Sequence, residues 1–338
     1  MDYARELAPF ALMRPDGIFT YDSAGSPVSP ADSHSPGADS HSPGSDSHSP
    51  GADSHSAGAD SHSAGADSHS PGAGRLPLVL IHGLGDEADT WRNIFPDLAR
   101  SRRVVALDLP GFGRTPCTGP STMEKHVAAV RAVLESTGPA ILAGNSMGAA
   151  AGQLTALRHP DLVRGLAFLD GGLPSGSAMS GKLLLTLLPG VGERAYRAWR
   201  KKPGQAYGSL TPYYADLASM AETDRAFLAR RVVERIMSDS QCRAYCSSFR
   251  SFLFMAAGAR GALLRDFSRT TLPLLLIWGE QDKILPPDTR RLLLEARPDC
   301  IDLLIPGAGH LPHQENPEAV IDALSSFIEK IDSGAPGL

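Results

Sequence analysis

One stretch decides the fold: residues 140–148 have the sequence Ala-Ile-Leu-Ala-Gly-Asn-Ser-Met-Gly. Residues 140–143 form an uninterrupted apolar run, which is typical of a short strand buried on both faces. Residues 147–158 follow with a helical pattern. The Gly-x-Ser-x-Gly motif between them places Ser146 at a tight turn, where flanking glycines relieve crowding and the hydroxyl stands clear of the backbone. We therefore predict that Ser146 is a nucleophile; a glycine-rich loop without a chemical role is the alternative.

Apolar runs of the same kind recur along the chain, each bounded by Gly, Pro or Asp. They predict strands at residues 78–81, 104–107, 140–143, 166–169, 274–278 and 301–305. Helical patterns lie between them, at residues 122–136, 147–158, 286–296 and 317–331. Residues 17–21 predict one earlier strand. This alternation is typical of a parallel α/β sheet with right-handed crossovers.

The rhythm of strands and helices stops between about residues 173 and 269, where no strand pattern occurs. Amphipathic stretches such as residues 222–238 take its place, so this interval is expected to be a helical insertion. Cys242 and Cys246 lie four residues apart on one helical face. No His or further Cys accompanies them, and a metal site is not expected there.

Residues 31–72 are six tandem copies of a seven-residue unit close to Ala-Asp-Ser-His-Ser-Pro-Gly. Such residues cannot bury enough apolar surface to offset backbone ordering, so we expect a disordered tract in a loop between two early strands. A flexible surface loop is the favoured interpretation, because lengthening a loop costs little closure entropy. Weak binding of divalent metal by the six histidines of the repeat, or modification of its Ser-Pro pairs, is the alternative.

Composition excludes several classes of protein. The 338 residues are 42% apolar and 20% charged, unlike a wholly disordered or collagen-like chain. The net charge of −5 becomes +1 without the repeat, so nucleic acid is not an expected partner. The apolar runs are far shorter than the roughly 18 residues of a transmembrane helix, so no membrane partner is expected, and four cysteines form no disulfide framework. Residues 1–14 lack the pattern of a secretory signal, and a cytoplasmic location is expected.

A serine hydroxyl needs a base to become nucleophilic, and the base needs a carboxylate to orient it. His310 follows the last predicted strand, and Asp282 follows the strand before it. Both residues therefore lie beyond carboxyl ends of strands, where open α/β sheets bind ligands. The order Ser146, Asp282, His310 is the nucleophile, acid and base order of an α/β-hydrolase triad.

Other side chains compete for these roles. His313 is the second candidate for the base. Asp170, at the end of its strand, is the structural competitor for the acid, and Glu280 ranks lower. His126 falls within a predicted helix and is expected at the surface, whereas His159 precedes a proline and is expected to end the helix that follows the serine.

The oxyanion formed during such a reaction needs hydrogen-bond donors. His82-Gly83-Leu84-Gly85 follows the strand at 78–81, and its glycines allow the backbone to turn inward and expose N–H groups. We predict the backbone N–H groups of Leu84 and Met147 as the pair of donors. His82 is expected to shape this turn through hydrogen bonds to the backbone rather than to act as the base.

Five ordered motifs together resemble the α/β-hydrolase superfamily, in its lid-bearing branch. They are His82-Gly83, Asp108-Leu109-Pro110-Gly111-Phe112-Gly113, the elbow at residues 144–148, Trp278-Gly279-Glu280-Gln281-Asp282 and Gly309-His310. The resemblance implies an eight-stranded, mostly parallel sheet flanked by helices, with a helical cap inserted after the sixth strand. It also implies that neither a metal nor an organic cofactor is needed, and it supports Asp282 as the acid. Because residue 146 is Ser and not Asp, the dehalogenase and epoxide-hydrolase branches are not expected.

The chain accordingly divides into five expected segments. Residues 1–30 hold the N-terminal segment with the first strands, and residues 31–72 hold the repeat. Residues 73–172 form the first part of the hydrolase core, 173–269 the helical cap, and 270–338 the second part of the core. The oligomeric state is left open.

The leading hypothesis is hydrolysis of a small carboxylic ester through an acyl-enzyme on Ser146, with a small-molecule substrate as the expected partner. Candidate pocket residues in the cap are Trp199, Tyr213, Tyr214 and Phe252; the alternative for each is the cap's own core. A carbon–carbon bond hydrolase acting on vinylogous diketones is the rival enzyme, since its elbow is similar.

The acidic substrates of that rival require a basic side chain, for which Arg194, Arg197 and Arg200 are candidates. A non-catalytic ligand-binding protein is the alternative of a different class, and the complete triad argues against it, since binding needs no ordered triad. The motifs do not specify the acyl chain, because packing decides the shape of a pocket.

Overall fold

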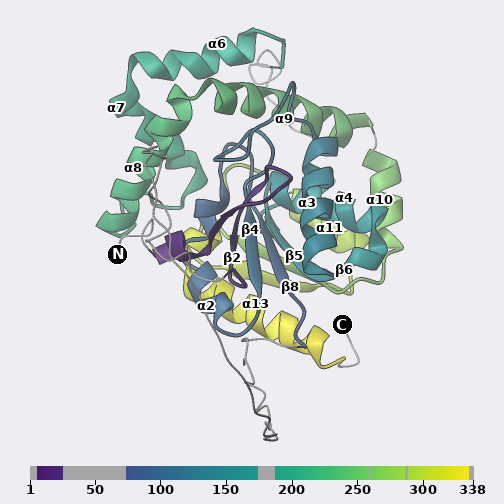
Figure 1. The fold of residues 1–338 in the computed structure, drawn as a ribbon. Helices are drawn as coiled ribbons and strands as arrows, with labels where there is room; N and C mark the ends of the chain where they lie inside the picture. Colours follow the sequence, from purple (N-terminus) through teal and green to yellow (C-terminus); the bar gives the residue numbers. More distant parts are fainter. Residues whose placement is uncertain (1–5, 26–73, 174–186, 259, 286–287, 335–338) are drawn as a thin grey trace, which may run out of the picture.

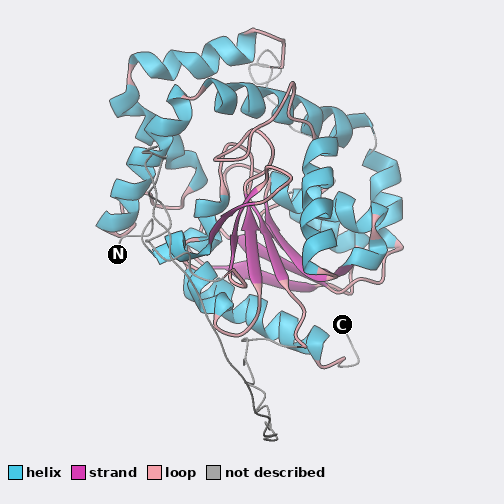
Figure 2. Ribbon diagram, viewed as in Figure 1, coloured by secondary structure: helices cyan, strands magenta, loops and turns pink. Residues whose placement is uncertain are grey.

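The computed structural model describes residues 6–25, 74–173, 187–258, 260–285 and 288–334. Its centre is one eight-stranded sheet with the strand order β1-β2-β4-β3-β5-β6-β7-β8. Strands β3 to β8 run parallel, whereas β1 and β2 are antiparallel at the edge beside β4. Figure 2 shows this sheet with helices on both sides. The mostly parallel α/β sheet expected from the sequence is confirmed.

The strands lie close to their predicted positions. They are β1 (Ala11–Met13), β2 (Phe19–Asp22), β3 (Leu78–Ile81), β4 (Val104–Leu107), β5 (Ala140–Asn145), β6 (Val163–Leu169), β7 (Leu274–Gly279) and β8 (Ile301–Ile305). The edge strand β1 is absent from the prediction, because three residues are too few to show a period. The predicted repeat, residues 31–72, lies outside the described residues; along the chain it falls between β2 and β3.

Two apolar cores, one on each face of the sheet, explain the uninterrupted apolar runs. Along β3, Val79 and Ile81 belong to one core, whereas Leu78 and Leu80 belong to the other. The first core is covered by α3 (Met123–Thr137), α4 (Met147–Arg158) and α11 (Asp288–Ala296). The second is covered by α2 (Phe95–Ala99) and α13 (Pro317–Asp332), which lie together below the sheet in Figure 1.

Helices occupy the interval between β6 and β7. Those described are α6 (Val191–Ala198), α7 (Pro203–Ala206), α8 (Glu222–Met237), α9 (Asp239–Gly258) and α10 (Arg260–Ser268), with the 3-10 segments η5 (Trp199–Lys201) and η6 (Tyr207–Tyr213). In Figure 1, α6 and α9 lie above the sheet and α8 lies to its side, whereas α10 lies near α11 and α4. No helix in these described ranges is long and apolar enough to cross a membrane.

The strand register brings the ends of the central strands to one edge. Ile81 of β3 lies beside Gly144 of β5, and Asn145 lies beside Leu169 of β6. Strands β7 and β8 also end side by side. The segments that follow β3, β5, β6, β7 and β8 therefore meet at this edge, and every residue predicted for the triad is in one of them.

Candidate active site

Ser146 lies at the turn between β5 and α4, as the motif predicts. Its backbone has φ 54° and ψ −119°, a combination that residues other than glycine rarely adopt, and its N–H donates to the Leu169 carbonyl at 3.0 Å. A Cβ atom at Gly148 would collide with the carbonyl oxygen of Ile81 on β3. At Gly144 a Cβ atom would lie 2.5 Å from backbone atoms of α4. The glycines thus allow the serine turn to press directly against its neighbours.

His310 and Asp282 meet at the same edge of the sheet, each with a side chain that is 2% exposed. The ring nitrogen Nδ1 of His310 lies 3.0 Å from Asp282 Oδ2. The other carboxylate oxygen, Oδ1, accepts the backbone N–H of Ile284 at 2.7 Å, so Asp282 is held from both ends. The His310 N–H donates to the Tyr213 carbonyl at 2.8 Å, which joins this residue to η6. With Nδ1 at the carboxylate, Nε2 is the ring nitrogen left for proton transfer.

Ser146 and His310 line one large cavity of about 1010 Å³. Asn145 ties their two segments together, because its Nδ2 donates to the carbonyl oxygens of His310 and Leu169, both at 3.0 Å. Among the described residues, Asp282 and His310 are hydrogen-bonded, whereas Ser146 Oγ makes no hydrogen bond to His310. Catalytic hydrogen bonds are often long in unliganded enzymes and tighten when substrate binds.

The predicted oxyanion donors come from two segments: Leu84 lies in the turn after β3, and Met147 begins α4. Leu84 and Met147 both line the cavity, and neither backbone N–H donates a hydrogen bond to another described residue. His82 shapes the turn as expected: its Nδ1 lies 2.8 Å from the Gly83 carbonyl oxygen, and its Nε2 accepts the Leu109 N–H at 2.9 Å. Because Nε2 accepts a backbone N–H, the His82 ring is neutral, and burial also lowers its pKa. Two N–H groups are therefore available at the cavity wall beside Ser146.

The predicted pocket residues Trp199, Tyr213, Tyr214 and Phe252 all line the same cavity. They are not equivalent. Trp199 is 40% exposed, whereas Tyr214 is 1% exposed and its hydroxyl donates to Gln314 Oε1 at 2.9 Å, so Tyr214 also joins the inserted helices to the core. Other apolar lining residues come from α8 and α9: Leu228, Val232, Ile236, Tyr245, Phe249 and Leu253.

Asp170, the competing acid, lies next to the Asp282–His310 pair. One oxygen of each carboxyl group and one ring nitrogen lie within 4.8 Å of one another. In the part of the chain that the structure describes, this is the cluster with a spacing suited to a metal ion. Asp170 Oδ1 accepts the Gly279 N–H at 2.9 Å and Asp282 contacts His310, whereas Asp170 Oδ2 has no partner among the described residues. We therefore interpret the cluster as a hydrogen-bonded group.

The expectation that His126 lies at the surface is wrong. Its side chain is fully buried beneath α9, where Nε2 lies 2.9 Å from Ser248 Oγ, and burial lowers its pKa to about 3. The sequence of α3 does not show that a distant helix covers this face. His313, the second candidate for the base, is also buried, with Nε2 2.9 Å from Thr90 Oγ1 and its ring against Trp91. Among the described residues His313 does not line the cavity.

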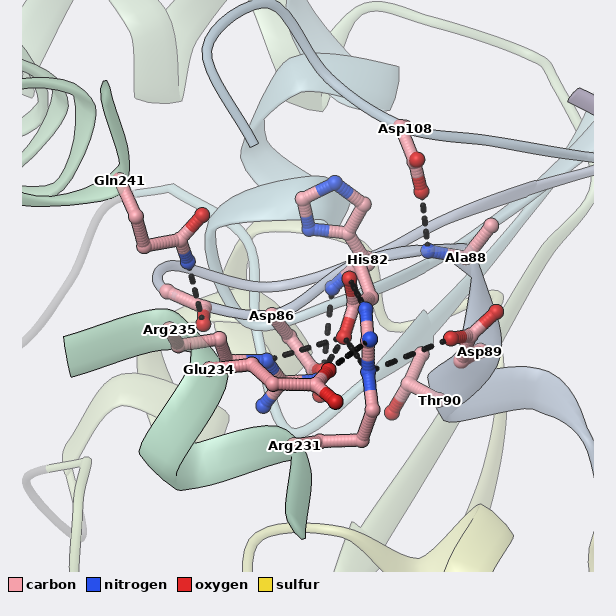
Figure 3. A network of polar contacts seen from close by, with 12 residues as sticks. His82, Asp86, Ala88, Asp89, Thr90, Asp108, Arg231, Glu234, Arg235 and Gln241 are labelled. Atoms are coloured by element: carbon pink, nitrogen blue, oxygen red, sulfur yellow. Dashed lines mark hydrogen bonds and ion pairs between the residues drawn. The ribbon is translucent and has the colours of Figure 1, made fainter. Parts of the chain in front are cut away.

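A buried charge network joins the turn after β3 to the inserted helices, and sequence reasoning missed it (Figure 3). Glu87 receives hydrogen bonds from Arg231 and Arg235 of α8, and Arg235 also pairs with Asp86 at 2.5 Å. From α9, the Gln241 side chain donates to the backbone of the turn at 2.9 Å. The only signal in the sequence is the spacing of the two arginines, which puts them on one helical face. Their acidic partners in the turn lie up to 149 positions away.

Comparison with known proteins gives a family and several relatives. The model of the alpha/beta hydrolase family matches residues 78–323. The dihydrolipoyllysine-residue acetyltransferase component of the acetoin cleaving system of Pseudomonas putida is 29% identical over 264 residues, which cover 76% of this chain. The match covers 64% of that protein, so the chain spans less than two thirds of it.

Two further likenesses have higher coverage. The pimeloyl-[acyl-carrier protein] methyl ester esterase of Edwardsiella ictaluri is 28% identical over 267 residues, which cover 76% of this chain and 95% of that protein. The solved structure of the 2-hydroxy-6-oxo-6-phenylhexa-2,4-dienoate hydrolase of Rhodococcus sp. strain RHA1 matches with a TM-score of 0.63 at 22% identity, covering 75% of this chain and 91% of that chain. At that identity the structural match supports the fold alone.

Proposed function

The chain belongs to the alpha/beta hydrolase family, and on that basis we propose that it hydrolyses a carboxylic ester with an apolar acyl group through an acyl-enzyme on Ser146. The supporting observation is the contact of 3.0 Å between Asp282 and His310, at the wall of the cavity that Ser146 also lines. A histidine held by a buried carboxylate at Nδ1 is arranged to accept a proton at Nε2. The N–H groups of Leu84 and Met147, which have no hydrogen-bond partner among the described residues, belong to the same wall.

Each group has one role in the proposed reaction. Ser146 Oγ attacks the ester carbonyl carbon while His310 Nε2 takes its proton, and Asp282 stabilises the imidazolium. The carbonyl oxygen becomes negative and is stabilised by the N–H groups of Leu84 and Met147. His310 then gives its proton to the leaving alcohol, and the acyl group remains on Ser146. A water molecule, deprotonated by His310, then attacks the acyl carbon. His310 returns that proton to Ser146 Oγ as the bond between Oγ and the acyl carbon breaks, which releases the carboxylic acid and the free serine.

The cavity favours a larger substrate than the small ester that the sequence suggests. Ligand sites commonly enclose roughly 300–1,000 Å³, and this cavity encloses about 1010 Å³. Helix α9 contributes Phe249, Phe252 and Leu253 to its wall, and α8 contributes Leu228 and Val232. We assign the acyl chain to this apolar wall, where its burial would contribute to binding.

A carbon–carbon bond hydrolase uses similar catalytic groups, but the charges around the cavity favour the ester. Arg197 and Arg200, two of the suggested cations, pair with Asp239 at 3.5 Å and 2.8 Å, and neither lines the cavity as described. Arg235 does line it, but two acids already hold its guanidinium. Among the described residues, Lys283 is the cation that lines the cavity without an ion pair. The carboxylate of an acidic dienone would therefore have Lys283 as its only unpaired cationic partner in this part of the chain.

The proposal is tested with nitrophenyl esters of graded acyl length beside a dienone carbon–carbon substrate, using the full chain and Ser146→Ala. We expect faster turnover of the longer acyl esters than of the acetate, and no turnover of any ester by the variant. Turnover of the dienone alone would identify the carbon–carbon hydrolase. No turnover at all, with a serine that does not react with a fluorophosphonate, would favour the non-catalytic binding protein.

A further inference from the structure

A second buried carboxyl group lies beside the proposed triad and has no part in the mechanism above. Asp170 follows β6, and its side chain is fully buried. One of its oxygens, one oxygen of Asp282 and a ring nitrogen of His310 lie within 4.8 Å of one another. The backbone φ of Asp170 is 43°, which is unfavourable for a residue with a side chain. Backbone strain of this kind is concentrated at functional sites, which indicates a functional role for Asp170.

The hydrogen bonds of Asp170 are incomplete if it is ionised. Oδ1 accepts the Gly279 N–H at 2.9 Å, but Oδ2 is buried and has no partner among the described residues. Asp282 has no donor to offer, because one of its oxygens contacts His310 and the other accepts the Ile284 N–H. An ionised Asp170 would therefore bury a charged oxygen without a hydrogen bond, close to a like charge.

The surroundings favour the neutral form of Asp170. Burial raises its pKa most, and the negative charges of Asp282 and Glu315 raise it further, against a smaller opposing effect of the Gly279 N–H. Glu315 is fixed at this edge because it accepts a backbone hydrogen bond from the segment before His310, at 2.9 Å. His310 adds no compensating charge while it is the free base.

We propose that Asp170 is a neutral carboxylic acid whose Oδ2–H donates a hydrogen bond to Asp282, and that it positions the carboxylate that orients His310. The proton supplies the donor that the two carboxyl groups lack and removes the repulsion between them. The added donor also makes Asp282 less basic, which keeps the shared proton on the imidazole, as the triad mechanism requires. The positioning role rests on the proposed function, whereas the protonation of Asp170 does not.

Two substitutions distinguish a neutral Asp170 from an ionised one. Asp170→Asn keeps an acceptor for Gly279 and replaces the O–H donor by an N–H donor, whereas Asp170→Ala removes both. On a nitrophenyl ester, Asp170→Ala should lose about tenfold in kcat with little change in KM, and Asp170→Asn should rescue most of that loss. Asp282→Asn is the reference and should lose about 10⁴-fold. A loss in Asp170→Asn as large as that of Asp282→Asn would overturn the proposal and identify Asp170 as the ionised acid.

A spectroscopic measurement tests the protonation of Asp170 without turnover and without the Asp170→Ala variant. Infrared spectra of Ser146→Ala and of Ser146→Ala/Asp170→Asn are compared at about pH 7, where an ordinary Asp is ionised. We expect the first protein to show the carbonyl band of a protonated carboxylic acid, shifted by deuterium exchange, and the second to lack it. If the difference between the two spectra contains only carboxylate bands, the proposal is overturned. Equal kcat in wild type, Asp170→Asn and Asp170→Ala would also overturn it, because Asp170 would then not position Asp282. If Ser146→Ala keeps full turnover, the proposed function fails, and the infrared result still decides the state of Asp170.

Discussion

Glu87→Gln removes the charge at the centre of the network between the turn after β3 and helix α8. Glu87 is 1% exposed and accepts hydrogen bonds from Arg231 and Arg235. Glutamine has nearly the same shape, so the substitution tests the charge and not the packing. Both arginines keep other acidic partners: Arg235 keeps Asp86 at 2.5 Å, and Arg231 keeps Glu234 and Asp89.

Two independent considerations give the size of the loss. Breaking a buried ion pair by removing one partner costs about 3–5 kcal/mol, and the acidic partners that remain reduce this cost. Burial raises the pKa of Glu87, but Arg235 and Arg231 outweigh that effect and lower the pKa from 4.5 to about 2. A depression of that size corresponds to about 3 kcal/mol of stabilisation by the ionised carboxylate. We expect Glu87→Gln to lower the free energy of unfolding by about 2–3 kcal/mol at neutral pH.

Urea unfolding followed by tryptophan fluorescence measures this loss and its pH dependence. Because the pKa of Glu87 is depressed in the folded state, the stabilisation of the fold by its carboxylate is complete above pH 4.5. This stabilisation is lost as the pH falls through about 2. The difference between wild type and Glu87→Gln should therefore stay constant from about pH 8 to pH 5 and shrink below about pH 4.

The matched control is Glu234→Gln, on the same helix but with a side chain that is 48% exposed. It should cost less than about 0.5 kcal/mol. Equal losses in the Glu87 and Glu234 variants, or a Glu87→Gln loss that does not change with pH, would refute the reasoning.

Three further predictions concern the elbow, the cavity and the chemistry. Gly148→Ala would bring a Cβ atom into the Ile81 carbonyl oxygen and should lower the free energy of unfolding by more than about 2 kcal/mol in urea, whereas Gly152→Ala in the same helix meets only ordinary contacts and should be neutral; equal stability would disprove the tight packing. Phe252→Ala removes a ring from the apolar wall and enlarges the cavity, so the preferred nitrophenyl ester should shift to a longer acyl chain. An unchanged preference would show that α9 does not contact the acyl chain. A chelator should leave ester turnover unchanged, since every proposed step uses groups of this chain; a loss restored by one divalent ion would show a metal requirement.

Much of the fold is predictable because the central strands are buried on both faces. In β3, alternate residues enter different cores, so the strand is apolar throughout and bounded by turn residues. The run at residues 140–145 shows where the prediction stops short, since the apolar run ends at Ala143 whereas β5 continues through Gly144 and Asn145. The edge strand β1 has no such pattern, because its three residues are half-buried or exposed.

The candidate site divides in the same way. Ser146, Asp282 and His310 each follow a recognisable strand, and parallel strands bring their carboxyl ends to one edge, so their proximity follows from topology. The burial of His126 and the partners of Glu87 depend on how α9 and α8 pack over distant segments. Periodicity within a helix shows that a face is buried or charged, but it does not show which segment covers that face.

The central claim is that Ser146 is a nucleophile activated by the base His310. Reaction of the full chain with a fluorophosphonate, followed by intact-protein and peptide mass spectrometry, tests this claim most directly. We expect a single adduct on Ser146, no adduct in Ser146→Ala, and much slower labelling in His310→Ala. An adduct on another residue, or equal labelling of wild type and Ser146→Ala, would contradict it.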